Sequence, residues 1–581
     1  MKRNLIFMSK CGKDLPNGYK GAFKEYGENA TIKKSFTLNG NFPKLFPSMC
    51  LSVEMDESDK IVTYDIQPSP KNISILEKNG LDPNKYFDDI ELHKKTKLLW
   101  KDIDKVHTPY DNFDFETAEL YAKLDGKDMK APDRMEALVK ETINRFRKSR
   151  KESYDISAYI DTFRKTEDKG QFGHLSLDDV IGLLNDKRFK VEDCMIKDKE
   201  LIEAHKFNRE SVLNRKRNKQ DFLPFEEIEE KLNEEKYCKF SEEQKRAILE
   251  LSNTAPTVLT GGAGSGKTSV IKGLLDMLDE FGIYDYLLLA PTGRASQRMR
   301  ETTGKEAYTI HHALGIAEDN GYKRYDENHQ LEYSVIITDE GSMIDDLLMC
   351  DLLKAAPDNT KLFFVGDKNQ LFPVGCGEPF CDFINDCLCH GITLSKNFRQ
   401  ANENGIGIYR NAERILNNED IKADTGVNIQ FIKETEIADF ASKTPDGKTQ
   451  NISPYNKVND IINEAATVHK KNGKEFFSFE KVVAIKNTKN YNNGDIGNIV
   501  EVHADGSLEI RFTQREIVSV PKEELNNIKP AYSLTVHKCQ GSEFEKVNLF
   551  IPIKMNKFIT KRLLYTAVTR AKENLNIYFY K

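Results

Sequence analysis

A glycine-rich loop between an apolar run and a helical run constrains this chain more than any other feature. Residues 261–268 read Gly-Gly-Ala-Gly-Ser-Gly-Lys-Thr and fit the phosphate-binding pattern G-x-x-x-x-G-K-[ST]. The apolar run Thr257-Val-Leu-Thr precedes the loop, and the helical run Ser269-Val-Ile-Lys-Gly-Leu-Leu follows it. The alternative, a glycine-rich turn without a ligand, requires neither this strand nor this helix. We therefore expect a strand, a phosphate loop and a helix here.

Apolar strands and helical stretches continue to alternate after this loop. Further apolar runs begin at Tyr286, Ser334 and Lys361. Strands that are apolar along their whole length are typical of a parallel sheet covered by helices on both faces. A β-rich stretch at about 481–530, with the turn Asn492-Asn-Gly-Asp-Ile-Gly, interrupts the pattern. The sequence predicts an α/β fold, with this stretch as a small β-barrel inserted into a second α/β lobe.

The amino-terminal part differs in character. Short alternating runs between Tyr19 and Pro68, bounded by Asn-Gly and Pro, predict a small β domain over residues 1–70. Residues 71–230 carry helical periods rich in Lys, Glu, Asp and Leu. We therefore expect an N-terminal β plus helical accessory region ahead of the α/β part.

The overall composition restricts the class of protein and its cellular compartment. The 581 residues include 86 Lys and Arg against 92 Asp and Glu, a net charge of −6, with 31% charged and 39% hydrophobic residues. These values are typical of a soluble globular protein and speak against a whole surface that binds nucleic acid, although not against a local basic groove. No apolar run reaches the ~18–20 residues of a membrane span, and the opening apolar stretch is too short for a signal peptide. Ten cysteines fit a reducing compartment, so we expect a cytoplasmic protein with no membrane association.

The loop carries the chemistry of phosphate binding. Its backbone amides and the helix N-terminus supply positive potential, Lys267 suits the β- and γ-phosphates, and the Thr268 hydroxyl suits Mg²⁺. The residues expected to bind the nucleotide here are Gly261, Gly262, Ala263, Gly264, Ser265, Gly266, Lys267, Thr268 and Ser269.

Two later strands should deliver polar side chains to the same edge of the sheet. Val335-Ile-Ile-Thr ends in Asp339 and Glu340, which we predict to hold Mg²⁺ through its water shell and to polarise the attacking water, respectively. Lys361-Leu-Phe-Phe-Val leads to Gln370, whose amide can donate and accept and so can sense the γ-phosphate. The alternatives are a surface turn for the two acids and a loop-capping amide for the glutamine.

Eight motifs in one order resemble those of superfamily 1 helicases, most closely the RecD-like branch. The resemblance covers about residues 235–581. The motifs are Phe240-Ser-Glu-Glu-Gln, Ala290-Pro-Thr-Gly-Arg-Ala, Thr309-Ile-His-His-Ala-Leu-Gly, Asp339-Glu-Gly-Ser-Met, Gly366-Asp-Lys-Asn-Gln, Asn397-Phe-Arg-Gln, Leu534-Thr-Val-His-Lys-Cys-Gln-Gly-Ser-Glu and Tyr565-Thr-Ala-Val-Thr-Arg-Ala-Lys.

This resemblance implies two RecA-like P-loop lobes with parallel sheets and an inserted small SH3-like β-barrel. The first lobe would span residues 231–396, the second 397–480 and 531–581, and the barrel 481–530. ATP and Mg²⁺ would be the cofactors, with Gln244 as the reader of adenine. Arg399 and Arg570 of the second lobe would reach the nucleotide and complete a catalytic set with Lys267, Asp339, Glu340 and Gln370.

The resemblance further implies an ATP-dependent helicase or translocase of single-stranded DNA and of its junctions with duplex, with 5′→3′ polarity. Hydroxyls, ring nitrogens and cations on both lobes suit the phosphates of a strand. The candidate residues for contact with single-stranded DNA are Thr292, Arg294, His311, Phe372, Thr535, His537 and Lys538. Two positions depart from the family pattern. Ala263 replaces a usual proline. Leu371-Phe-Pro-Val replaces Leu-Pro-Ser-Val, so the resemblance does not define the path of the DNA beside that loop.

Simpler interpretations stay open for several of these residues. Thr292 and Arg294 also suit an ordinary helix N-terminus, and His537 and Lys538 suit a helix cap. His312, beside His311, favours packing over contact.

Two other clusters have structural interpretations as well. Four cysteines between Cys376 and Cys389 have spacings that fit no standard zinc site. The basic runs that begin at Arg145 and Arg215 favour a solvated helix face over contact with a duplex or a partner.

Other functions also fit the motifs. An RNA helicase or nucleoprotein remodeller would carry similar lobes, and a P-loop switch would bind nucleotide without translocation. Residues 1–230 are a possible surface for a protein partner.

Overall fold

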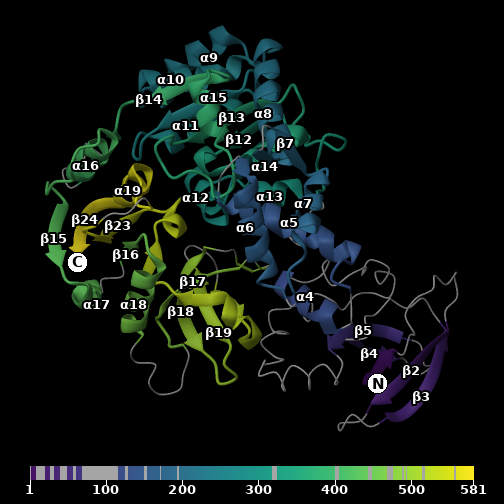
Figure 1. Cartoon of the computed structure of the whole chain (residues 1–581). Coiled ribbons are helices and arrows are strands. Elements are labelled where there is room, and N and C mark those ends of the chain that lie inside the picture. Colours follow the sequence, from purple (N-terminus) through teal and green to yellow (C-terminus); the bar gives the residue numbers. More distant parts are fainter. Residues whose placement is uncertain are drawn as a thin grey trace. The chain divides into compact units, whose positions relative to one another are not determined.

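A computed structural model describes residues 2–7, 20–26, 32–39, 49–55, 61–68, 115–124, 128–149, 153–170, 172–192, 195–316, 323–398, 405–442, 448–467, 476–486, 488, 490–491, 494–512, 517–554 and 558–581. The chain falls into two compact units, one up to Glu200 and the other from Leu201 onward (Figure 1).

The first unit begins with an antiparallel sheet in the order β3-β2-β1-β4-β5. The opening apolar stretch forms its central strand β1, where Leu5 pairs with Glu25 on one side and with Leu51 on the other. The strands are β1 (Lys2–Phe7), β2 (Lys20–Tyr26), β3 (Ile32–Asn39), β4 (Met49–Met55) and β5 (Ile61–Pro68).

The accessory region of this unit is mainly helical but also contains a small sheet. Its helices are α4 (Phe115–Leu124), α5 (Pro132–Ser149), α6 (Ile156–Glu167) and α7 (Leu177–Gly182). Three short antiparallel strands, β6 (Ser153–Asp155), β7 (Phe189–Glu192) and β8 (Met195–Asp198), lie among them. The prediction missed this sheet because strands of three or four residues give almost no periodic signal.

The second unit contains a six-stranded parallel sheet, which confirms the α/β prediction for this part (Figure 1). Its order is β11-β10-β12-β13-β9-β14, and all five strand pairs are parallel. Its strands are β9 (Thr257–Gly261), β10 (Tyr286–Ala290), β11 (Ala307–Thr309), β12 (Val335–Thr338), β13 (Lys361–Gly366) and β14 (His390–Leu394).

Helices cover this sheet and bury its apolar strands, in agreement with the runs of the sequence. Every residue of β9, β12 and β13 is buried. The helices are α8 (Lys199–Arg217), α9 (Phe225–Leu232), α10 (Glu242–Leu249), α11 (Lys267–Glu280), α12 (Gly293–Thr303), α13 (Ile310–Leu314), α14 (Asp346–Ala355) and α15 (Pro379–Asn385).

The compact unit that holds this first lobe begins before the predicted border at residue 231. Val212 of α8 and Leu223, Ile228 and Leu232 around α9 are buried in the same hydrophobic clusters as the sheet. Arg215, from one of the basic runs, is itself buried and donates to the carbonyls of Pro357 and Ala356 at the end of α14. These residues therefore belong to the first lobe, because their side chains complete its core.

A second parallel sheet, in the order β15-β24-β23-β16-β22, forms the second lobe. Its strands are β15 (Val427–Ile432), β16 (Thr449–Ser453), β22 (Ser533–Thr535), β23 (Phe544–Pro552) and β24 (Ala571–Tyr580). Its helices are α16 (Ile406–Leu416), α17 (Ile437–Ser442), α18 (Asn456–Ala466) and α19 (Lys561–Val568).

An antiparallel sheet in the order β20-β19-β18-β17-β21 interrupts the second lobe between β16 and β22. It has its own core, which includes Tyr491, Ile499 and Phe512. Its strands are β17 (Lys481–Ala484), β18 (Ile496–Val502), β19 (Leu508–Phe512), β20 (Ile517–Val520) and β21 (Ile528–Pro530). The inserted β structure thus matches the β-rich stretch, while its SH3-like closure stays a prediction. None of the described helices combines the length and apolar character needed to cross a membrane.

A buried lysine at the start of β13 should make the stability of the first lobe depend on pH. Lys361 is fully buried, and its Nζ donates to the Ala255 carbonyl (2.6 Å) and the Thr257 hydroxyl (2.9 Å). Burial lowers the pKa of Lys361 to about 7. Above pH 7 the unfolded chain holds a proton that the folded chain lacks, so the free energy of unfolding should rise with pH.

We predict that Lys361→Met removes a slope of up to ~1.4 kcal/mol per pH unit between pH 7 and pH 9. Urea unfolding at both pH values measures it. Lys272→Met, at an exposed position of α11, is the matched control and should keep the wild-type slope. Equal slopes in wild type and Lys361→Met would contradict the prediction.

Candidate nucleotide site between the two lobes

The phosphate loop runs from β9 to α11 and depends on glycine at two points. Gly264 and Gly266 have φ of 83° and 85°, a left-handed conformation that side chains disfavour. A Cβ on Gly266 would also lie 2.4 Å from Nε2 of Gln244. Lys267 Nζ donates to the loop's own carbonyls at Gly261 (2.6 Å) and Gly262 (3.0 Å). The cationic amine is therefore held over the loop, where a phosphate can replace those carbonyls.

Asp339 and Glu340 follow β12 directly and lie beside this loop. The backbone N–H of Glu340 donates to Asp339 Oδ1 at 2.8 Å. Burial raises the pKa of both carboxyls, and the charge of Asp339 raises that of Glu340 further, while Lys267 and Arg298 act in the opposite direction. Glu340 also has φ of 52°, a strained conformation for a residue with a side chain.

Gln370 lies in the loop after β13 and points its amide into the same region. The side chain is buried, and its Oε1 makes no hydrogen bond among the described residues. A buried acceptor without a partner is costly, so this amide is suited to a ligand.

The second lobe contributes Arg570, which lies between α19 and β24. The side chain is only 2% exposed. Its Nε donates to the Thr566 carbonyl and its Nη1 to the Ser542 carbonyl, both at 2.9 Å. These backbone acceptors fix the guanidinium without neutralising its charge.

One cavity of about 270 Å³ joins these groups. Lys267 and Arg570, although 570 − 267 = 303 residues apart, both line it. Its lining residues are Ala263, Gly264, Gly266, Lys267, Thr268, Ser269, Arg298, Asp339, Glu340, Gln370, Glu543 and Arg570. Sequence reasoning missed Arg298 and Glu543 as cavity residues. The signal for Arg298 was its place one helical turn after Arg294.

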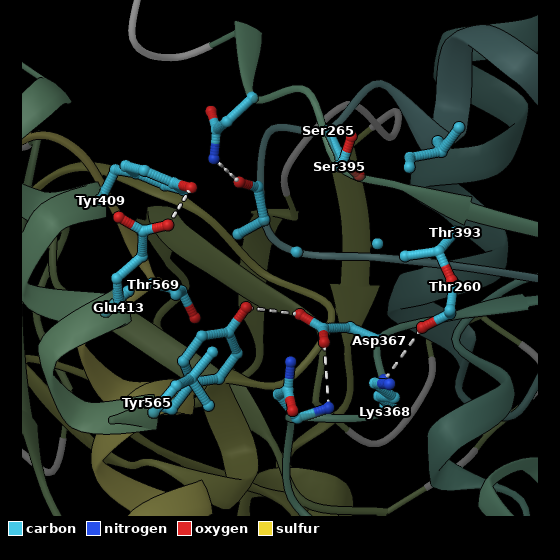
Figure 2. Close-up of a pocket in the computed structure, with 18 of the residues that line it drawn as sticks. Thr260, Ser265, Asp367, Lys368, Thr393, Ser395, Tyr409, Glu413, Tyr565 and Thr569 are labelled. Carbon is cyan, nitrogen blue, oxygen red and sulfur yellow. Dashed lines mark hydrogen bonds between the residues drawn. The ribbon is translucent and has the colours of Figure 1, made fainter. Parts of the chain in front are cut away.

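The loop that carries Gln370 is attached to the helix that precedes Arg570. Tyr565 of α19 donates its hydroxyl to Asp367 at 2.8 Å (Figure 2), and the N–H of Leu371 donates to the Thr566 hydroxyl at 3.0 Å. A second cavity of about 190 Å³, between α16, α19 and the phosphate loop, surrounds this contact (Figure 2). A movement of α19 therefore reaches the Gln370 loop directly.

Gln244 and the motif that begins at Asn397 pack on the phosphate loop. Gln244 is buried, caps α10 and donates to the Gly266 carbonyl at 3.3 Å. Asn397 donates to the Ala263 carbonyl at 2.8 Å, and a Cβ on Gly266 would lie 3.3 Å from the ring of Phe398. Phe398, which is 39% exposed, is an aromatic surface beside Gln244 that the sequence reading missed. Arg399 lies outside the described residues.

The residues of the first lobe that are predicted to contact DNA differ in burial and in their hydrogen-bond partners. Thr292 caps α12 by accepting from the Ala295 N–H at 3.2 Å. The guanidinium of Arg294 lies 5.4 Å from the ring centroid of Phe544 in the second lobe, and its Nη1 makes no hydrogen bond among the described residues. His311 is exposed. His312 is exposed as well, and its ring stacks on Tyr308 with the two centroids 5.2 Å apart.

The residues of the second lobe that are predicted to contact DNA are partly exposed to solvent. His537 and Lys538 are exposed, and Thr535 accepts from the Lys538 N–H at 3.3 Å. Local burial and the neighbouring Lys529 lower the pKa of Lys538. Phe372 is half-buried, and the Arg562 guanidinium lies 3.8 Å from its ring centroid, so one face of this predicted wedge is covered.

The other clusters have structural partners. Cys376, Cys381 and Cys389 are buried and Cys387 is exposed. Arg147 of the basic run in α5 pairs with Asp198 at 2.6 Å. This guanidinium is bound within its own unit.

A phosphate loop whose cavity is completed by a cation from a second parallel-sheet lobe is the arrangement of P-loop NTPases with two RecA-like lobes. Two family models match this chain: an AAA domain over residues 244–376 and a UvrD-like helicase C-terminal domain over residues 530–578. The matched ranges contain the phosphate loop and Arg570, respectively.

The names of proteins with similar sequences agree with these two family models. The chain is 30% identical over 359 residues to the ATP-dependent RecD2 DNA helicase of Deinococcus radiodurans, covering 57% of this chain and 48% of that protein. It is 29% identical over 476 residues to the RecBCD enzyme subunit RecD of Buchnera aphidicola subsp. Acyrthosiphon pisum, covering 65% of this chain and 78% of the subunit. The chain thus spans about half the length of the RecD2 relative. The chain is thus similar in sequence to RecD-like helicases of superfamily 1.

Similar solved structures include the Pif1 helicase from Bacteroides in complex with ADP-AlF3 and ssDNA, at 18% identity and a TM-score of 0.41, covering 58% of this chain and 92% of that one. The Pif1 helicase from Candida albicans has 19% identity and a TM-score of 0.39, covering 58% of this chain and 94% of that one.

The raised pKa of Glu340 predicts a conflict between stability and activity. A carboxyl whose pKa is raised by folding destabilises the folded state once the pH exceeds its unfolded value, and protonation at lower pH removes that cost. We expect Glu340→Gln to raise the melting temperature at pH 7.5, by ~2–4 °C for each kcal/mol relieved, and to lose ATP hydrolysis.

Thermal unfolding at pH 7.5 and pH 5 measures this effect, and the difference from wild type should shrink at pH 5. Glu306→Gln, at an exposed position, should leave both properties unchanged. A Glu340→Gln protein that melts below wild type at both pH values would contradict the account.

Proposed function

We propose that this protein is an ATP-dependent DNA helicase that translocates along single-stranded DNA, with 5′→3′ polarity. The observation that carries the proposal is the single cavity that Lys267 and Arg570 line from two different lobes. A nucleotide in that cavity must touch both lobes, so its binding and hydrolysis change how the lobes hold each other.

Lys267 and Arg570 would act on the phosphates. The amine of Lys267 exchanges the carbonyls of Gly261 and Gly262 for the β- and γ-phosphates. Arg570 is pre-positioned by backbone acceptors, so little ordering is needed before it stabilises the charge of the transition state. Arg399 would add a second cation, by family resemblance.

A magnesium ion fits the residues at this site. Thr268 and Asp339 both line the cavity, and they offer the hydroxyl and carboxylate oxygens that Mg²⁺ prefers. Burial raises the pKa of Asp339, and a divalent cation would favour its charged form. The bound ion would neutralise part of the phosphate charge. Glu340 would polarise the attacking water. Gln370 would donate to the γ-phosphate through its side-chain N–H, and its free amide oxygen could accept from a water molecule.

The contacts of Asp367 with Tyr565 and of Leu371 with Thr566 would transmit the state of the nucleotide. Gln370 stands between the cavity and these contacts. Alternate grip by the two lobes would then move a strand. The proposed strand contacts are Thr292, Arg294, His311 and Phe372 on the first lobe and Thr535, His537 and Lys538 on the second.

The substrate would be single-stranded DNA and its junctions with duplex, in the cytoplasm. The RecD2 relative is named a DNA helicase, and this favours DNA over RNA. A P-loop switch that does not translocate would not require Arg570 to reach the cavity from the second lobe. Residues 1–230 are proposed to contact a protein partner, since the relatives named RecD are subunits of the RecBCD enzyme.

The first test removes the phosphate-binding amine. We expect Lys267→Ala to lose more than ~99% of strand-stimulated ATP hydrolysis while it still binds single-stranded DNA, because an activated phosphoryl transfer depends on its charge contacts. Steady-state hydrolysis with and without oligonucleotide, and anisotropy of a labelled strand, measure the two properties. Lys272→Ala on the same helix should behave as wild type. Undiminished hydrolysis in Lys267→Ala would refute the site.

The second test compares substrates of equal duplex length with a 5′ or a 3′ single-stranded overhang, in DNA and in RNA. We expect ATP-dependent unwinding of the DNA with the 5′ overhang. Unwinding only from the 3′ overhang would reverse the proposed polarity, and stimulation only by RNA would replace the substrate. No stimulation by any strand would leave the nucleotide switch as the function.

A further inference from the structure

An ion pair that joins the two lobes lies in the wall of the nucleotide cavity. Arg298 of α12, in the first lobe, donates through Nη2 to Glu543 Oε2 of the second lobe at 2.8 Å. Lys572 of β24 lies 3.7 Å from the same carboxylate oxygen. The Glu543 side chain is 12% exposed, against 40% for Arg298 and 51% for Lys572. One shielded carboxylate is thus shared by two more accessible cations.

The cations of the cavity are held in different ways. Lys267 and Arg570 donate to backbone carbonyls. Arg298 instead pairs with a carboxylate side chain from the opposite lobe. Its bond to Glu543 can therefore be replaced by a bond to another anion in the same cavity.

Arg298 also faces the acid pair. Burial acts to lower the pKa of Arg298, but Glu543, Glu340 and Asp339 together raise it above its usual value. The guanidinium therefore lies within the field of the carboxylates at the end of β12, where the terminal phosphate would be hydrolysed. A nucleoside triphosphate would bring further negative charge to this point.

We propose that Arg298 exchanges Glu543 for the terminal phosphate of a bound nucleoside triphosphate. The ion pair then joins the lobes when the cavity holds a diphosphate or no nucleotide, and it opens when a triphosphate binds. This inference rests on the proposed function only in that the cavity takes a nucleoside triphosphate.

The exchange leaves no charge without a partner. A buried carboxylate that loses its cation destabilises the protein, but Glu543 would retain Lys572. The planar guanidinium binds phosphate oxygens in the same forked geometry as carboxylate oxygens. Because both end states pair their charges, a ligand of ordinary affinity can shift the equilibrium between them.

The test measures binding of fluorescent, non-hydrolysable triphosphate (β,γ-imido) and of the matching diphosphate, without DNA. The quantity of interest is the ratio of the two affinities, because contacts to base, ribose and the shared phosphates cancel in it. We expect Arg298→Gln to lower the preference for triphosphate by about tenfold, the effect of one charge-assisted contact. Glu543→Gln frees Arg298 and should raise the preference by roughly threefold.

The double variant separates exchange from independent effects. Glu543→Gln should have no effect on the ratio in the Arg298→Gln background, because there is no longer a guanidinium to release. Lys572→Gln removes one of the two cations beside Glu543 and should lower the preference for triphosphate. Arg300→Gln, which removes a contact to the Ala307 carbonyl on the same helix, is the control and should keep the wild-type ratio.

Additive effects of the two substitutions, or equal losses of di- and triphosphate in Arg298→Gln, would overturn the exchange. Thermal unfolding of each variant identifies one that fails to fold, and Arg298→Lys then supplies the measurement, with an intermediate ratio expected. If Lys267→Ala binds triphosphate as tightly as wild type, the proposed nucleotide site fails. If Lys267→Ala loses binding while Arg298→Gln keeps the wild-type ratio, only the exchange fails.

Discussion

The hydrogen bond from Tyr565 to Asp367 is the contact on which the arrangement of the two lobes around one cavity depends. Asp367 begins the loop that carries Gln370, and Tyr565 belongs to the helix that leads to Arg570. Both partners are buried, so separating the lobes here would leave Asp367 Oδ2 without its hydrogen bond, which is costly. The contact therefore holds the loop that carries Gln370 and the helix that leads to Arg570 together, and both residues line a cavity with the phosphate loop.

The same cavity concentrates charge that the fold does not neutralise locally. Burial raises the pKa of Asp339 and Glu340, the backbone of Glu340 is left-handed, and Gln370 has an amide oxygen without a partner among the described residues. Each of these features costs stability and none is needed to form the sheet. Such costs gather where a ligand removes them, which is why they support a binding site more firmly than any single motif.

The sequence predicted the sheet strands of the first lobe and the polar ends of two of them, because buried parallel strands are uniformly apolar and the phosphate loop has a distinctive pattern. It could not predict side-chain contacts between distant segments. The guanidinium of Arg294, for example, lies over the ring of Phe544, which is 250 positions later in the chain (544 − 294 = 250). Arg298 and Glu543 were missed for the same reason, since only the folded lobes bring them together. The short strands β6, β7 and β8 are too brief to show a period.

Arg215 shows that α8 is part of the first lobe rather than an attachment to it. Its guanidinium binds the carbonyls at the end of α14, and Val212 on the same helix fills the core between α14 and the sheet. α14 in turn begins just after the loop of Asp339 and Glu340. The compact unit that contains both lobes therefore starts at Leu201, ahead of the phosphate loop and of every motif. A truncation at the first motif would strip the cap from α14 and loosen the scaffold behind the acid pair, although no catalytic group would have been deleted.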